Sequence, residues 1–127
     1  MNIIGNGVDI VENKRINKLI DNKKFIKRVF TNKEIKFSKN IKNKTNYFAK
    51  RFAAKEAFSK ALGTGISSGI NFNEILILNK KSGKPYISLI GQTKKIFSSK
   101  VKNKKTKIAL SVSDEKKYAV AFVTISI

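Results

Sequence analysis

The residue types that could do chemistry in this chain are few. Its 127 residues contain no His and no Cys, and 8 Asp and Glu stand against 28 Lys and Arg. Imidazole bases, cysteine nucleophiles, thiolate zinc sites and disulfides are therefore excluded. Any reaction must use carboxylates, lysines, arginines, hydroxyl groups or a bound ion.

Two of the acids, Asp9 and Glu56, lie among apolar neighbours. Asp9 follows Val8 and precedes Ile10, and a carboxylate buried there would need a cation or a metal as partner. Glu56 stands four residues before Lys60, which is the spacing of an ion pair on one face of a helix. From the residues alone, Asp9 fits a buried salt bridge as well as a ligand, and for Glu56 the simple ion pair is preferred.

A glycine loop, Gly63-Thr64-Gly65, follows Lys60. Its backbone N–H groups could bind an anion, although its simpler role is a helix cap and a turn. The end of a helix disfavours phosphate unless cations compensate, and Lys60, Arg51 and Lys55 could supply that charge. Two acids, lysines and a glycine loop are together what a magnesium and pyrophosphate site needs.

The hydrophobic pattern predicts the elements that must bring these residues together. Strands are expected at 3–11, 74–79, 85–90, 107–113 and 118–127. Helices are expected twice between 13 and 30, with a break near 21–22, then from a Thr31/Glu34 capping box to about 38, from an N-cap at Thr45 to 62, and at 92–100. The order β-α-α-α-α-β-β-α-β-β predicts one α+β domain over 1–127, with helices packed on a largely antiparallel sheet.

The formal charge of +20 favours anionic partners, among them nucleic acid, acidic proteins and phosphorylated metabolites. The lysines are spread along the chain, so for any one of them a solvated surface is the simplest interpretation. No basic leader and no long apolar run are present, which favours a cytoplasmic protein with no membrane partner.

Four blocks of sequence resemble the holo-(acyl-carrier-protein) synthase family, the short 4′-phosphopantetheinyl transferases of fatty-acid synthesis. They are Gly7–Glu12 (GVDIVE), Arg51–Gly65 (RFAAKEAFSKALGTG), Gly83-Lys84-Pro85, and Leu110–Asp114 (LSVSD) with Tyr118-Ala119. The blocks occur in the family's order over essentially the whole chain, and the middle block is the most specific of them. The resemblance implies a 4′-phosphopantetheinyl transferase-like fold and a homotrimer with each site between subunits.

The resemblance also implies the reaction, in which 4′-phosphopantetheine passes from coenzyme A to a serine of apo acyl carrier protein and adenosine 3′,5′-bisphosphate leaves. Asp9, Glu56 and Lys60 then stand as catalytic residues. Asp9 and Glu56 match the family's Mg²⁺ ligands, and Lys60 matches the lysine that contacts the pyrophosphate. The expected coenzyme A contacts are Lys60, Gly63, Thr64, Gly65, Arg51, Lys84 and Pro85. The proton acceptor is either Glu56 or a metal-bound water, and the residues do not choose between them.

Acyl carrier proteins are acidic, so the basic first helices are the expected docking surface. Its residues are Arg15, Lys18, Phe25, Ile26 and Arg28, with Lys23 and Lys24 beside them. Asp114 stands where many members of the family have His, so any proton transfer at this position is in doubt. Asp114 either extends the metal shell or fixes the hairpin, and the hairpin is slightly preferred.

Two alternatives remain at this point. A small nucleic-acid-binding module would explain the high pI, but it leaves Asp9 and Glu56 without a role and has no recognition helix or stacking motif. A catalytically dead relative that only binds carrier protein is the other, and the intact Asp9, Glu56 and Lys60 speak against it.

Overall fold

The computed structural model describes residues 1–63 and 69–127. Its elements follow the predicted order with one added 3₁₀ helix, η2. They are β1 (Ile3–Glu12), α1 (Asn13–Leu19), α2 (Lys23–Val29), α3 (Asn32–Ser38), α4 (Lys44–Leu62), η2 (Phe72–Glu74), β2 (Ile75–Asn79), β3 (Pro85–Leu89), α5 (Gly91–Lys100), β4 (Lys107–Asp114) and β5 (Tyr118–Ser126). The predicted α+β fold is therefore confirmed.

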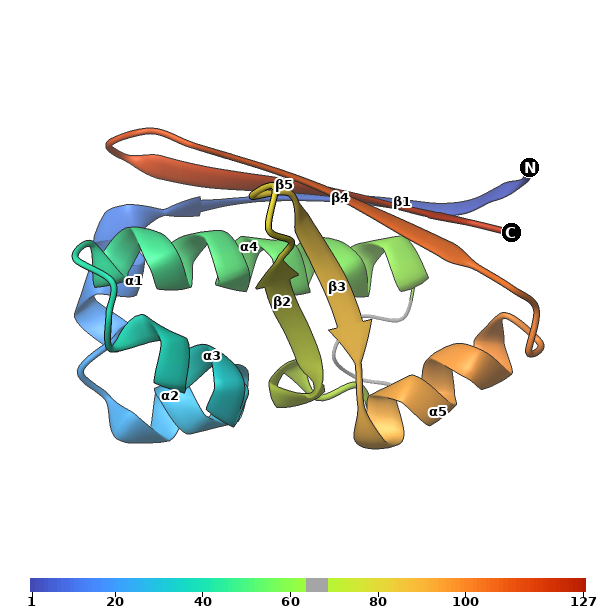
Figure 1. The fold of residues 1–127 in the computed structure, drawn as a ribbon, viewed down its shortest axis with the longest axis horizontal. Helices are drawn as coiled ribbons and strands as arrows, with labels where there is room; N and C mark the ends of the chain where they lie inside the picture. Colours follow the sequence, from blue (N-terminus) through green and yellow to red (C-terminus); the bar gives the residue numbers. More distant parts are fainter. Residues whose placement is uncertain (64–68) are drawn as a thin grey trace.

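The strands form two antiparallel sheets, where the sequence predicted one. β1, β5 and β4 form a three-stranded sheet in the order β1-β5-β4, and β2 pairs with β3 alone. Figure 1 shows all the helices and the β2–β3 hairpin below the three-stranded sheet, with α4 running along it. Among the described residues, nothing covers the opposite face of this sheet.

α4 is the centre of the fold and is buried on nearly every side, because it lies between the sheet and the layer of α1, α2, α3 and β2. Its buried residues include alanines at positions 49, 53, 57 and 61, spaced one turn apart, together with Phe48, Phe52 and Phe58. These small side chains allow β1 to approach closely. A β-carbon at Gly7 would overlap the carbonyl oxygen of Ala57, and one at Gly5 that of Ala61. The glycine face of β1 therefore packs against α4.

The opposite face of β1 is apolar and exposed. Val8 and Ile10 are 53% and 62% exposed, and Phe122 on the paired strand β5 is 45% exposed. Together they form an apolar patch on the outer face of the three-stranded sheet.

Capping signals located most helix ends correctly. Thr31 and Glu34 form the predicted capping box of α3, and Gly63 ends α4 in the left-handed conformation with φ of 81°. The prediction that Thr45 caps α4 is wrong. Asn43 is the N-cap and its side chain accepts a hydrogen bond from the backbone N–H of Asn46, so the helix begins two residues earlier than an N-cap at Thr45 implies.

Glu74, which lies 18 residues before Gln92 in the sequence, caps the start of α5 with its side chain. Its carboxylate accepts hydrogen bonds from the N–H groups of Gln92 (3.0 Å) and Thr93 (3.1 Å), the Thr93 hydroxyl (2.9 Å) and the Asn71 side chain (3.0 Å). These N–H groups lie in the first turn of the helix, where no intrahelical acceptor exists. Although burial pushes the pKa of Glu74 upward, the hydrogen bonds together hold it below its usual range.

No helix in the described part of the chain combines the length and apolar character needed to cross a membrane.

Candidate active site

Asp9 and Lys60 meet where the glycine face of β1 lies on α4. Because residues alternate along the strand, Asp9 shares the inner face with Gly5 and Gly7. The Lys60 ammonium donates hydrogen bonds to Asp9 Oδ1 (3.2 Å) and to the carbonyl oxygen of Val8 (3.1 Å). The Asp9 side chain is 16% exposed and that of Lys60 is 55% exposed, so the pair lies at the partly exposed edge of the contact between β1 and α4.

Glu56 lies one turn before Lys60 on α4, but the predicted ion pair between them does not form. Lys60 bonds to Asp9 instead. Burial raises the pKa of Glu56, the neighbouring Asp9 carboxylate raises it further, and Lys60 and Arg15 partly oppose this. The charges of Asp9 and Glu56 are thus close enough to interact, Lys60 is bonded to Asp9, and the charged form of Glu56 is disfavoured.

This carboxylate pair, Asp9 and Glu56, is suited to a magnesium ion. Mg²⁺ prefers oxygen ligands and is commonly bound by one or two carboxylates, with water and substrate phosphates completing its shell. Within residues 1–63 and 69–127, no group of three or more acidic, His or Cys side chains surrounds a common point, so the protein would contribute two ligands. A bound cation would relieve the repulsion that raises the pKa of Glu56.

Of the predicted glycine loop, Gly63 alone belongs to the described residues. Its N–H donates to the carbonyl oxygen of Lys60 (3.0 Å) as a helix cap. Thr64 and Gly65 lie outside the described residues.

The nucleotide residues predicted from the sequence gather at a second place, around an open cavity of about 380 Å³. Arg51, Gly83, Pro85 and Asp114 line it, while Lys84 is exposed beside Pro85. The Arg51 guanidinium lies 3.7 Å from the centre of the Tyr47 ring and donates to Asn79 Oδ1 (3.0 Å). Burial lowers the pKa of Arg51. The cavity therefore offers a fixed, partly desolvated cation.

Asp114 ends β4 at the same cavity, where its Oδ2 accepts a hydrogen bond from the Asn46 side chain on α4 (2.6 Å). The turn that follows β4 is closed by the Glu115 N–H, which donates to the Tyr118 carbonyl oxygen. Asp114 thus ties the β4–β5 hairpin to α4.

The predicted docking residues are spread over α1 and α2. Arg15, Lys18 and Arg28 are exposed, whereas Phe25 and Ile26 are half-buried. The Phe25 ring packs against Phe52 and Phe30 with centroids 6.1 Å apart in each case, and the Arg15 guanidinium lies 5.7 Å from the centre of the Phe52 ring.

The ion pair between Lys55 and Glu34 was not predicted from the sequence, which placed Lys55 near the phosphates. Lys55 was expected to add charge near the phosphates, but it is fully buried on the other side of α4 and bonds to Glu34 at 2.6 Å. Glu34 was noticed only for its capping box. A carboxylate next to an apolar residue, Ile35, is unusual in a chain with so few acids, and this could have indicated that Glu34 is buried and paired.

Comparison with known proteins agrees with these features. A family profile, described as the 4′-phosphopantetheinyl transferase superfamily, matches residues 5–123. The holo-(acyl-carrier-protein) synthase of Pelagibacter ubique is 52% identical over 123 residues, covering 97% of this chain and 96% of that protein. The Vibrio campbellii enzyme of the same name is 46% identical over 126 residues, covering 97% of each chain.

Solved structures give the same result. The Neisseria meningitidis holo-(acyl-carrier-protein) synthase superposes with a TM-score of 0.87 at 37% identity and covers 98% of this chain and 99% of that one. The Bacillus anthracis synthase, solved in complex with CoA (3′,5′-ADP), has a TM-score of 0.81 at 37% identity and covers 98% and 97%. The comparisons lend no support to a nucleic-acid-binding module. This chain belongs to the 4′-phosphopantetheinyl transferase superfamily and, within it, to the holo-(acyl-carrier-protein) synthases, which are transferases.

Proposed function

We propose that this protein transfers 4′-phosphopantetheine from coenzyme A to a serine hydroxyl of apo acyl carrier protein, releases adenosine 3′,5′-bisphosphate, and depends on Mg²⁺. The observation that carries the proposal is the Asp9–Lys60 ion pair between β1 and α4, with Glu56 one helical turn before Lys60 and near enough to Asp9 for their charges to interact, in a chain of this family. The attacked phosphorus stays at the same oxidation level, and the serine oxygen replaces the bisphosphate oxygen on it.

Phosphoryl transfer leaves little covalent work for a protein, so positioning and charge neutralisation must lower the barrier. Asp9 and Glu56 would hold the metal ion, which when bound neutralises charge on the pyrophosphate oxygens. Lys60 is 55% exposed at the end of a long side chain with several rotatable bonds, so its ammonium would turn from Asp9 toward the pyrophosphate and stabilise the departing bisphosphate. Gly63, Thr64 and Gly65 would contact the coenzyme beside it.

Arg51, Lys84 and Pro85 would bind the nucleotide part of coenzyme A from a neighbouring subunit of a homotrimer. Arg51 and Lys60 lie about 13 Å apart along α4. They also belong to different places, since Arg51 lines the cavity and Lys60 is paired with Asp9 of β1. The apolar patch of Val8, Ile10 and Phe122 on the outer sheet face supports assembly, because a patch of this kind typically marks a protein interface. Light scattering should then give three times the chain mass of 14.3 kDa.

The carrier would dock on the surface formed by Arg15, Lys18, Phe25, Ile26 and Arg28. Its acidic side chains would meet the exposed arginines and lysine, which sets the rate of encounter. The half-buried Phe25 and Ile26 would add a smaller apolar contact. An enzyme of this kind acts in fatty-acid synthesis in the cytoplasm.

The test is an incubation of the protein with coenzyme A, Mg²⁺ and an apo carrier protein, followed by intact-mass spectrometry of the carrier. We expect a gain of roughly 340 Da, the mass of the transferred group, and no gain when the metal is chelated. A carrier that binds without gaining mass would identify a dead relative and contradict the proposal.

A further inference from the structure

The described part of the chain buries one lysine and one acid completely. The side chains of Lys55 and Glu34 are each 0% exposed, and every other lysine is exposed or half-buried. Burying two charges removes them from water, which must be compensated by close partners. Replacing such a pair with apolar side chains of similar volume often leaves stability unchanged or improves it, so a buried pair calls for an explanation beyond stability.

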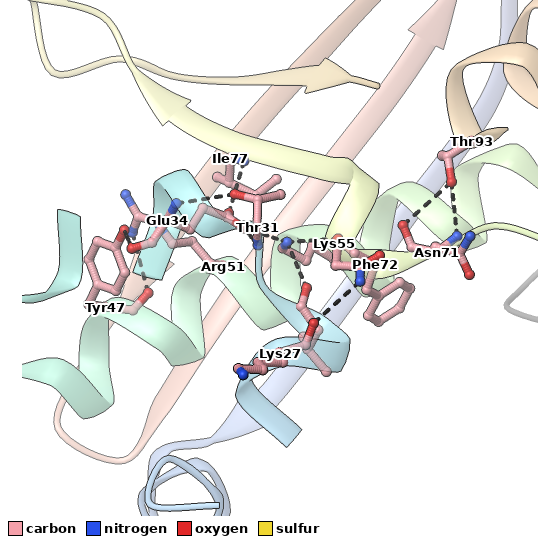
Figure 2. A network of polar contacts seen from close by, with 12 residues as sticks. Lys27, Thr31, Glu34, Tyr47, Arg51, Lys55, Asn71, Phe72, Ile77 and Thr93 are labelled. Atoms are coloured by element: carbon pink, nitrogen blue, oxygen red, sulfur yellow. Dashed lines mark hydrogen bonds and ion pairs between the residues drawn. The ribbon is translucent and has the colours of Figure 1, made fainter. Parts of the chain in front are cut away.

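Each polar atom of the pair has a partner. The three protons of the Lys55 ammonium go to Glu34 Oε1 (2.6 Å), the Val29 carbonyl oxygen (2.8 Å) and the Phe72 carbonyl oxygen (2.8 Å). Glu34 Oε1 also accepts from the Thr31 N–H (2.9 Å), and Oε2 accepts from the Ile77 N–H (3.0 Å). Figure 2 shows these contacts converging on Lys55 and Glu34.

The contacts join segments that are far apart in the sequence. Val29 is the last residue of α2, Thr31 caps α3, Phe72 begins η2, and Ile77 lies in the middle of β2. Lys55 therefore fixes the end of the docking helix α2 to α4 through a directed bond of definite length. Apolar packing alone would permit sliding between the two helices.

Lys55 is adjacent to Glu56, the candidate metal ligand on the same helix. The docking surface rests on the same part of α4, since Phe25 packs on Phe52 and the Arg15 guanidinium lies over the Phe52 ring. Asp9, Glu56 and Lys60 are positioned independently of the pair, because β1 holds Asp9 against α4 through its glycine face.

We propose that Glu34 and Lys55 are positioning residues that set the distance between the carrier docked on α1 and α2 and the carboxylate pair of Asp9 and Glu56. This inference rests on the proposed function. It assigns the pair no contact with substrate and no proton transfer. Misplacement of reacting groups by about 1 Å can reduce a rate roughly a hundredfold, so a fixed bond at this junction acts on the transfer step.

The test is the double variant Glu34→Leu/Lys55→Met, which replaces the pair with apolar side chains and leaves neither charge alone. We expect kcat for carrier modification to fall roughly tenfold or more, while the Kd for apo carrier, measured by calorimetry, and the KM for coenzyme A each stay within about twofold. Arg28→Glu is the matched comparison on the exposed docking surface, and it should weaken carrier binding far more than it lowers kcat at saturation. Thermal unfolding verifies that each variant is folded at the assay temperature.

Glu34→Gln is the milder variant, and it tests the positioning role if the double variant unfolds. It keeps an acceptor for Lys55 but presents an NH₂ group to the Ile77 N–H, so we expect the same pattern at roughly threefold. A folded variant with full kcat, or a loss of kcat accompanied by an equal loss of coenzyme A affinity, would overturn the positioning role. Wild-type protein that transfers nothing would instead overturn the proposed function.

Discussion

Lys55 and Glu56 are neighbours in the sequence and have opposite electrostatic surroundings. On one side of α4, the three protons of Lys55 are all bonded and its charge is matched by Glu34 at 2.6 Å. On the other side, Glu56 faces Asp9, a charge of its own sign, and its pKa is raised by burial and by that neighbour. The first arrangement is complete within the protein. The second leaves Glu56 without a bonded cation among the described residues, which is the kind of environment that favours cation binding.

The largest effect that tests this contrast is the loss of turnover in Glu56→Gln. The amide keeps the size of the side chain but cannot hold a divalent cation as a carboxylate does, so kcat should fall by roughly 10²- to 10³-fold or more. The carrier mass assay measures it. Unchanged turnover would contradict the assignment of Glu56.

The same variant should be slightly more stable than the wild type when no metal is present. A carboxylate whose folded pKa is raised destabilises the folded state once it is ionised, so removing its charge should raise the unfolding temperature by roughly 1–3 °C near pH 7. Adding Mg²⁺ with coenzyme A should stabilise the wild type and leave Glu56→Gln nearly unchanged. A variant that is less stable under metal-free conditions would show that the carboxylate is structural.

On the paired side of α4, a single substitution should have the opposite consequence. Lys55→Met leaves Glu34 buried without its cation and should cost about 3–5 kcal/mol of unfolding free energy, or roughly 10–20 °C in the unfolding temperature. Lys50→Met is the control, because Lys50 is half-exposed on the same helix, and its effect should stay within about 0.5 kcal/mol. If the two substitutions lowered the unfolding free energy equally, the buried ion pair of Lys55 would contribute no more than an ordinary lysine on the same helix.

The sequence predicts contacts between residues that are close along the chain better than contacts between distant ones. The capping box of Thr31 and Glu34 spans four residues, and the sequence revealed it directly. The bond from Glu34 to Lys55 spans 21 residues, and in a chain with lysines throughout nothing distinguishes the one that is buried. Long-range pairs of this kind are visible only once the backbone brings their elements together.

The candidate site around Asp9, Glu56 and Lys60 was easier to predict, because the close contact between β1 and α4 requires glycines that are visible in the sequence. Gly5 and Gly7 share the inner face of β1 with Asp9, and their missing side chains allow the strand to approach α4 closely enough for Asp9 to reach Lys60. The N-cap of α4 was wrong by two residues because Asn43 and Thr45 can both cap, and only the backbone decides between them. The single predicted sheet became two because β3 is not hydrogen-bonded to β4, which no strand pattern reveals.

A further effect concerns the docking surface on α1 and α2. Arg28→Glu should raise the KM for carrier roughly tenfold and the KM for coenzyme A far less, because opposite charge at the docking surface slows encounter with an acidic partner. Lys94→Glu on α5 is the matched control with the same change in net charge at an exposed lysine remote from α1 and α2. The gap between the two variants should narrow at high salt. An equal rise for both would assign the effect to overall charge.

The last effect is also small and concerns Glu74, a carboxylate that is satisfied by hydrogen bonds and has no cation bonded to it among the described residues. Its pKa is held below the ordinary 4.5 by these bonds, which outweigh its burial, so its stabilising contribution is present above that value and is lost as the pH falls through the lower folded pKa. Glu74→Gln should therefore lower the unfolding temperature by roughly 2–4 °C at pH 7, and the gap should close toward pH 3. Thermal unfolding of both proteins across this range measures it. A gap that widens on acidification would mean that the protonated carboxyl holds α5 better than the ionised one, and hydrogen bonds alone would then not suffice to keep a charge stable in this protein.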